Sequence, residues 1–162
     1  MEHAPGPAWA VALEASRLAT FVRTSDFLYP LANVLHIFGV ALVLGAVVAL
    51  DLRLLGLGRA LPLRAVSDYL LPLIWIGLAL VIPSGFLMFA ADAGPLVGST
   101  IFQVKMLLLV AALANAVLFR MLFDRRLANG DGRAPAGGML LAGLSLLLWP
   151  AVIVAGRLLG YL

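Results

Sequence analysis

The sequence places one histidine inside a long apolar segment, and this residue carries most of the chemistry that the chain offers. His36 shares a helical face with Tyr29 and Asn33, at spacings of i, i+4 and i+7, and Gly39 continues that face. A neutral imidazole is an axial ligand of haem iron, and a glycine one turn later leaves room for a flat macrocycle. We therefore predict a haem iron site at His36, with Asn33 or Tyr29 fixing the imidazole tautomer.

Two basic residues in other apolar segments lie near the same depth as the histidine. Counted at ~1.5 Å per residue, His36 lies roughly 13 Å from one end of its segment, and Lys105 and Arg157 lie roughly 8 Å from the corresponding ends of theirs. Ser84, which follows Pro83 in the second apolar segment, adds a polar group at a similar level, so that four segments contribute one each. Polar groups inside a membrane are costly and mark candidate sites. Arg157 would pair with a haem propionate, and Lys105 would do the same or serve as the second axial ligand.

Each of these residues also has a purely structural interpretation. A single histidine in a membrane helix can hydrogen-bond to a neighbouring helix, and Lys105 and Arg157 can extend to the lipid headgroups. The methionines have no repeated Met-x-x-Met spacing, which disfavours a copper(I) thioether pathway. Several aspartates lie at predicted helix ends, where capping or solvation accounts for them. They are Asp26, Asp51, Asp68, Asp92 and Asp124. Proton transport on buried acids therefore loses support.

The elements that hold these residues are membrane helices. Of the 162 residues, 64% are hydrophobic and only 12% are charged, whereas soluble domains carry about 25% charged residues. Four apolar segments approach the ~20 residues that cross a ~30 Å hydrocarbon core. They span residues 27–50, 69–91, 100–123 and 138–162. The predicted fold is all-α, an integral membrane four-helix bundle formed by residues 25–162.

Residues 1–24 form a leader that precedes the bundle. Its segment from Trp9 to Val22 predicts an amphipathic helix in the membrane interface, with the tryptophan at the headgroups. Ser25 or Asp26 would cap the first membrane helix. Prolines inside the later segments predict kinks. These prolines are Pro72, Pro83 and Pro150.

The basic residues orient the chain in the membrane. Most of them lie between the first and second predicted helices, or at the end of the third and in the connection to the fourth. They are Arg53, Arg59, Arg64, Arg120, Arg125, Arg126 and Arg133. Positive charge favours the cytoplasm, which predicts a multi-pass protein of the bacterial inner membrane with both termini periplasmic. No aromatic–basic patch indicates nucleic acid, and the absence of cysteine excludes disulfides and thiolate metal sites.

Several short motifs resemble those of known membrane families. In the first helix, His36-Ile-Phe-Gly39, then Gly45 and Arg53-Leu, is similar to the first helix of the HemJ-like and CopD-like families. Lys105-Met-Leu-Leu-Leu-Val with Asn115 is similar to their third helix. The ending Leu148-Trp-Pro, followed by Gly-Arg157 and Tyr161, resembles an uncharacterised bacterial group of four-helix proteins in this neighbourhood. The chain is identified as a member of that group.

The resemblance implies roles for two residues. His36 matches the haem ligand of the HemJ-like proteins, which act as protoporphyrinogen oxidases, and Lys105 matches the important lysine of their third helix. CopD-like proteins are linked to copper uptake. HemJ-like chains tend to carry a histidine about ten residues after that lysine, where this chain has Asn115. The resemblance thus supports a haem pocket more than porphyrinogen oxidation.

Three hypotheses follow. The first is a membrane protein that binds one haem b at His36 and acts in redox chemistry or electron transfer, as a haem-dependent membrane oxidoreductase. Its partners would be the lipid bilayer and a quinone, a porphyrin or an electron-transfer protein. The second is a membrane scaffold or accessory subunit without catalysis, in which His36 joins two helices. The third is copper transport of the CopD type.

Overall fold

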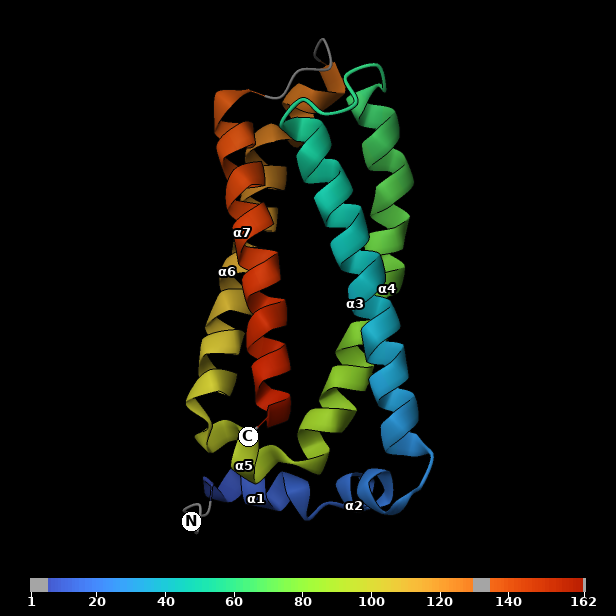
Figure 1. Ribbon diagram of the computed structural model, residues 1–162, viewed down its shortest axis with the longest axis vertical. Helices are drawn as coiled ribbons and strands as arrows, with labels where there is room; N and C mark the ends of the chain where they lie inside the picture. The colour runs from blue at the N-terminus through green and yellow to red at the C-terminus, as the bar shows by residue number, and fades with distance from the viewer. Residues whose placement is uncertain (1–5, 130–134, 162) are drawn as a thin grey trace.

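The protein is a bundle of long helices that stands on a layer of short ones (Figure 1). The computed structural model describes residues 6–129 and 135–161, with the side chains of residues 124–129 excepted. Within these ranges the chain forms seven α-helices and a final 3-10 turn. They are α1 (Ala8–Glu14), α2 (Arg17–Thr24), α3 (Leu28–Leu54), α4 (Leu63–Ala91), α5 (Ala93–Gly98), α6 (Thr100–Asn129), α7 (Ala136–Leu158) and η1 (Leu159–Tyr161).

Four of the helices are long and apolar enough to cross a membrane. These are α3, α4, α6 and α7, the last taken together with η1. At 1.5 Å per residue each exceeds the ~30 Å thickness of the hydrocarbon core. The predicted all-α, membrane-spanning four-helix bundle is therefore confirmed.

The long helices extend beyond the apolar segments that predict them. Helix α4 begins at Leu63, six residues before the predicted start at residue 69, and α6 continues to Asn129, six residues past residue 123. Helix α3 ends at Leu54 rather than at residue 50, and the last helix ends as an α-helix at Leu158. Hydrophobicity marks the part of a helix that lies in lipid, whereas polar residues can continue the same helix outside it. The sequence therefore predicted the membrane-spanning part of each helix better than the residues at which the helix begins and ends.

The leader forms two short helices, so the prediction of one helix from Trp9 to Val22 is wrong. The break lies at Ser16, whose backbone is extended and whose hydroxyl oxygen accepts a hydrogen bond from the Ala19 N–H at 3.2 Å. A serine in this geometry caps a new helix, which ends the previous one. The prediction that Ser25 or Asp26 caps α3 is wrong, because the cap residue is Phe27, without a side-chain cap. The Ser25 hydroxyl oxygen accepts from the N–H groups of Phe27 and Leu28 in the turn before the helix.

The four long helices are arranged as two pairs, α3 with α4 and α6 with α7, and α7 joins the pairs by packing against α3. Helices α1, α2 and α5 lie across one end of the bundle, which we call the platform end (Figure 1). At the opposite end residues 55–62 connect α3 to α4, and we call this the loop end. A small apolar core at the loop end links both pairs through Leu54, Leu63 and Ala142.

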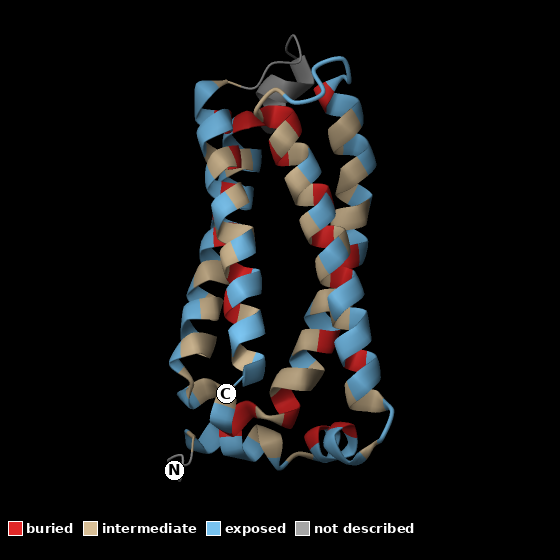
Figure 2. Ribbon diagram, in the orientation of Figure 1, coloured by how far each residue is buried: buried red, intermediate tan, exposed pale blue. Residues whose placement is uncertain are grey.

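The interior consists mainly of small residues, whereas large apolar side chains face outward. Figure 2 shows exposed residues along the outer faces of all four long helices, which is the pattern of a lipid-facing surface. Helices α3 and α4 cross closely at Gly39 and Gly77, where a Cβ on either glycine would lie 2.8 Å from the carbonyl oxygen of the other. Glycine is required at this crossing because no larger residue fits without separating the helices.

Candidate functional site

His36 is held against α4 by polar contacts of one ring nitrogen. Its Nδ1 lies 3.2 Å from the carbonyl oxygen of Val81 and 3.1 Å from the hydroxyl oxygen of Ser84. The Ser84 hydroxyl donates its proton to the carbonyl oxygen of Leu80, and so it faces the imidazole as an acceptor. Both neighbours of Nδ1 therefore accept, which places the proton on Nδ1 and leaves the Nε2 lone pair available to a ligand.

Gly85 fixes the imidazole ring from a second side. A Cβ at this position would lie 3.0 Å from Cε1 and 3.3 Å from Nδ1 of His36. Ser84 was expected from the sequence only as a polar group at a depth similar to that of His36, and neither its contact with the ring nor Gly85 was predicted. The available signal is the run Pro83-Ser84-Gly85 in the middle of an apolar helix, because each of these residues is unusual there.

Lys105 on α6 faces the bundle interior rather than the lipid headgroups. Its side chain lies against α7, where a Cβ at Gly156 would be 3.6 Å from Cε and 3.7 Å from Nζ. The ammonium group is close enough to interact electrostatically with the His36 ring. No ion pair or hydrogen bond to this ammonium occurs in residues 6–129 and 135–161. We call His36, Ser84, Gly85 and Lys105 the histidine site.

The other predicted site residues lie apart from this arrangement. Tyr29 has its hydroxyl within hydrogen-bonding reach of Asp92, at the platform end. Asn33 is exposed, and none of the described contacts joins it to His36. The tautomer of His36 is set by α4 instead of by Asn33 or Tyr29.

Gly39 does not provide the open space that its position predicted. The volume beside it is filled by Gly77, Leu80 and Val81 of α4. Its lack of a side chain allows the close crossing of α3 and α4, which brings His36 to its acceptors. The prediction of room for a macrocycle at Gly39 is therefore wrong.

Arg157 turns toward the end of its own helix. It is exposed, its Nη2 donates to the Tyr161 hydroxyl at 3.1 Å, and its guanidinium carbon lies 4.9 Å from the Tyr161 ring centre. A cation stacked on an interfacial tyrosine suits a headgroup position. The structure thus brings Lys105, but not Arg157, to the histidine site.

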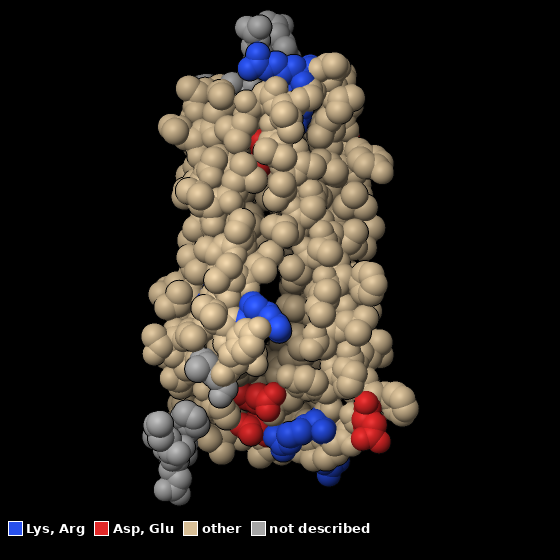
Figure 3. Space-filling model, viewed as in Figure 1, with Lys and Arg blue, Asp and Glu red and all other residues tan. Residues whose placement is uncertain are grey.

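The platform closes the bundle at the end nearer the histidine site. Glu14 of α1 accepts a hydrogen bond from the Gly94 N–H at 2.9 Å, and Arg23 of α2 donates to the Ala91 carbonyl at 3.1 Å. Figure 3 shows charged side chains gathered at this end, and above them an opening between the two helix pairs with a basic side chain at its edge. Open space between the pairs therefore lies in the same half of the bundle as the platform.

Asp51 was interpreted as a solvated helix end, and this interpretation is wrong. Only 6% of its surface is exposed, because α7 covers the end of α3. The Ser145 hydroxyl of α7 lies within hydrogen-bonding reach of the carboxylate. The bundle thus contains a buried acid that hydropathy alone could not identify.

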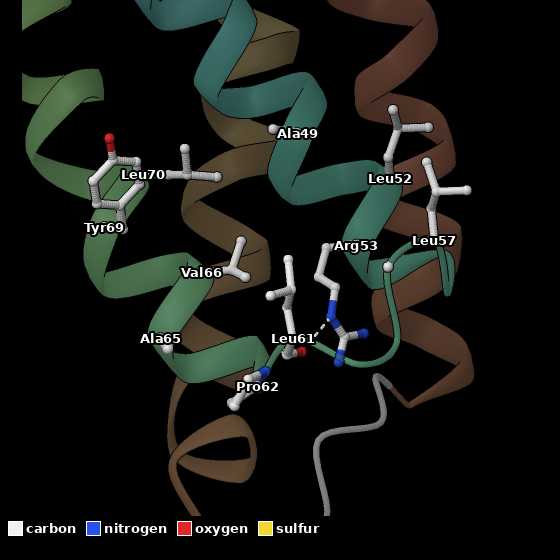
Figure 4. A pocket seen from close by; sticks show the side chains of 11 residues that line it. Ala49, Leu52, Arg53, Leu57, Leu61, Pro62, Ala65, Val66, Tyr69 and Leu70 are labelled. Carbon is white, nitrogen blue, oxygen red and sulfur yellow. Dashed lines mark hydrogen bonds between the residues drawn. The ribbon is translucent and has the colours of Figure 1, made fainter.

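An apolar groove lies at the loop end between α3 and α4 (Figure 4). Its volume is about 530 Å³, and apolar side chains such as Leu52, Val66 and Leu70 line most of it. Arg53 crosses one end, where its Nε donates to the Leu61 carbonyl at 2.8 Å. No group of three or more His, Cys, Asp or Glu side chains suited to a metal ion occurs in the described part of the chain.

Comparison with known proteins gives one family. The model of a family of unknown function, DUF6644, matches residues 9–162, from the start of the platform to the last residue. No curated protein and no solved structure matches the chain.

Proposed function

The chain belongs to the DUF6644 family, and we propose that it binds one b-type haem through His36 and transfers electrons within the bacterial inner membrane. The observation that carries this proposal is the contact of His36 Nδ1 with the Val81 carbonyl. Histidines that ligate metals almost always donate the other ring N–H to a carbonyl or carboxylate, which orients the ring. The donor chemistry of His36 therefore fits an axial ligand.

Lys105 would supply the second polar group toward the cofactor. Its ammonium lacks an acidic partner in the described residues and lies near His36. An unpaired cation inside a bundle would be stabilised by a propionate, or would ligate the iron after losing its proton. Haem iron held there would supply one-electron chemistry to a quinone, a porphyrin or a redox protein.

The full-length protein, purified in detergent, provides the test. We expect purified protein, supplemented with haem, to show a Soret band that is absent in His36→Ala. Lys105→Gln serves as a second variant, because it keeps the histidine and should shift the band or weaken binding. Wild-type protein without a Soret band after haem supplementation would overturn the proposal.

The contacts of His36 also favour a second candidate, a scaffold or accessory subunit without a cofactor. In that case the hydrogen bonds to Val81 and Ser84 simply join α3 to α4. His36→Ala would then lower the unfolding temperature and change no absorbance at any haem concentration. The same two measurements on one variant separate the candidates.

We also infer that the loop end is cytoplasmic and the platform periplasmic. The connection after α3 carries Arg59, and Arg53 and Arg64 flank it. Since the chain has no cysteine, single cysteines report the orientation directly. An impermeant thiol reagent should label Tyr161→Cys in intact spheroplasts, and Arg59→Cys only after permeabilisation. The reverse pattern would overturn the orientation.

A further inference from the structure

A second polar group lies inside the bundle toward the loop end, and the haem proposal does not use it. Asp51 of α3, Asn115 of α6 and Ser145 of α7 are 6%, 7% and 5% exposed. The Ser145 hydroxyl reaches the Asp51 carboxylate, and Asn115 Nδ2 donates to the Leu141 carbonyl at 3.0 Å. Three helices thus contribute buried polar side chains to one region.

Three buried atoms around this region have no hydrogen-bond partner in the described residues. They are Asp51 Oδ2, Asn115 Oδ1 and the indole Nε1 of Trp149. Buried polar atoms in folded proteins almost always have a partner in protein or ordered water. Two of these atoms accept hydrogen bonds and one donates. Small molecules that both donate and accept hydrogen bonds, such as water, would satisfy all three.

The spacing along α7 fits a row of water molecules. Leu141, Ser145 and Trp149 follow one another at four-residue intervals, so they share a face and are separated by about 6 Å along the helix axis. One water that bridges two oxygen atoms spans about 4.5 Å, and up to about 5.5 Å where its two bonds are nearly in line. Water molecules between successive turns would satisfy the unpaired atoms. We call Asp51, Asn115, Ser145 and Trp149 the aspartate site.

A neutral hydroxyl group, and no cation, acts on the Asp51 carboxylate within the described residues. Ser145 is the only hydrogen-bonding side chain that acts on Asp51 among the described residues. On its own helix, Arg53 donates to the Leu61 carbonyl, and on α6 the nearest basic residue beyond Asn115 is the exposed Arg120.

The start of α4 adds only an exposed ion pair, between Arg64 Nε and Asp68 Oδ2 at 3.7 Å. Within its described residues α7 adds no acidic group, and its basic residue, Arg157, lies at the platform end. An ionised carboxylate with an unpaired oxygen is strongly disfavoured inside a membrane bundle. A protonated carboxyl avoids this cost and also gains a donor for water.

We propose that the aspartate site is a hydrated proton-binding site, in which the Asp51 carboxyl group exchanges a proton with water at the loop end. The transfer makes or breaks one O–H bond on the carboxyl group, and the proton passes to or from a bridging water. This proposal uses none of the residues of the histidine site. It holds whether or not haem is bound.

Infrared spectroscopy of the purified full-length protein tests the protonation directly. We expect a carbonyl stretch of a protonated carboxylic acid at mildly acidic pH, which weakens as pH is raised and shifts in D₂O because water has access to the group. The band should disappear in Asp51→Asn and persist in Asp68→Asn, the exposed acid of α4. Its absence in wild type, or its persistence in Asp51→Asn, would overturn the proposal.

Thermal unfolding provides a second measurement. A carboxyl group that keeps its proton only in the folded state makes the fold less stable as pH rises. The unfolding temperature of wild type should therefore fall as pH rises from about 4, where unfolded carboxyl groups ionise, toward neutrality, and Asp51→Asn, which resembles the protonated acid, should remove that dependence. A dependence that Asp51→Asn leaves unchanged would contradict the proposal. So would an unfolding temperature that rises with sodium instead of choline chloride, which would indicate a bound cation.

Discussion

The histidine site and the aspartate site are two solutions to the problem of placing polar groups inside a membrane. The histidine site lies in the half of the bundle near the platform, where one pair of helices contributes the imidazole and the other contributes Lys105. The aspartate site lies where α3 and α7 pack together, and the side chains of Asp51, Asn115 and Ser145 are almost fully buried. The first site has a free ligand atom and a cation without an acidic partner in the described residues, whereas the second has buried polar atoms without a hydrogen-bond partner there.

This difference teaches that the two sites depend on different helix contacts. His36 reaches its acceptors because α3 and α4 cross closely, and Asp51 is buried because α7 packs on α3. Changes confined to one contact should therefore affect one site and spare the other. Four substitutions test this separation, beginning with the largest expected effect.

Gly77→Val should separate α3 from α4. A Cβ at Gly77 would already lie 2.8 Å from the Gly39 carbonyl and 3.0 Å from the Val43 nitrogen. Overpacking of this kind costs up to ~3 kcal/mol, and we expect loss of haem binding with it. Thermal unfolding and the Soret band measure the two effects, and the infrared band of Asp51 should remain.

Gly45→Val on α3 is the matched control for this change. A Cβ at Gly45 would meet no atom of the described chain within 4 Å, so this variant should unfold near the wild-type temperature. Equal losses in both variants would show that the effect is not specific to the crossing of α3 and α4. Loss of the Asp51 band in Gly77→Val would show that the two sites are coupled.

Gly85→Ala should weaken ligand binding at His36 with little change in stability. The added methyl group would lie 3.0 Å from Cε1 and so would turn the ring away from its acceptors. Loss of an orienting contact typically lowers metal affinity by about 10- to 100-fold. Haem titration followed by absorbance measures this change. Gly143→Ala, in open space on α7, is the control and should bind haem as wild type does.

Lys105→Met should have a smaller effect. It should leave the unfolding temperature equal or raise it, and it should lower the affinity for haem. Methionine keeps the unbranched apolar stem of the side chain, one atom shorter, and removes a cation that has no acidic partner in the described residues, so the unfolding temperature should stay equal or rise. Haem affinity should fall about 10-fold, as expected for one charge-assisted hydrogen bond of ~1.5 kcal/mol. Arg157→Met, at the exposed platform end, should change neither quantity. A fall in stability in Lys105→Met would show that the ammonium supports the fold.

The fold was predictable to the level of its four spans, and the histidine site only in part. Apolar segments of suitable length identify membrane helices because lipid imposes one hydrophobic thickness. His36 and Lys105 were recognised because polar residues inside such segments are rare. Ser84 was recognised for the same reason as a polar group at a similar depth, but its contact with His36 was not predicted. The Val81 carbonyl was not recognised, because a backbone carbonyl has no sequence signal.

The aspartate site could not be predicted for a different reason. Asp51 lies at the boundary of an apolar segment, where a carboxylate is ordinarily solvated. Whether water reaches it depends on the packing of α7 against the last turns of α3, and this contact joins residues almost a hundred positions apart. The depth of a residue along its own helix does not show whether another helix covers its side chain and shields it from water.

Asn115→Ala should produce the smallest effect. It tests whether Asn115 takes part in the hydration of Asp51 or only joins α6 to α7. The variant removes the bond from Asn115 Nδ2 to the Leu141 carbonyl and one of the unpaired acceptors. Hydrogen bonds between membrane helices contribute about 0.6 kcal/mol on average, so the unfolding temperature should fall only slightly.

The infrared band of Asp51 should persist but move, because the water that it contacts loses a neighbour. Haem titration should be unchanged. Gln103→Ala is the control for loss of a side-chain amide, because Gln103 Nε2 donates to the Val97 carbonyl at the platform end, far from the aspartate site. An unmoved band in Asn115→Ala would show that Asn115 only joins α6 to α7, and would confine the proton site to α3 and α7.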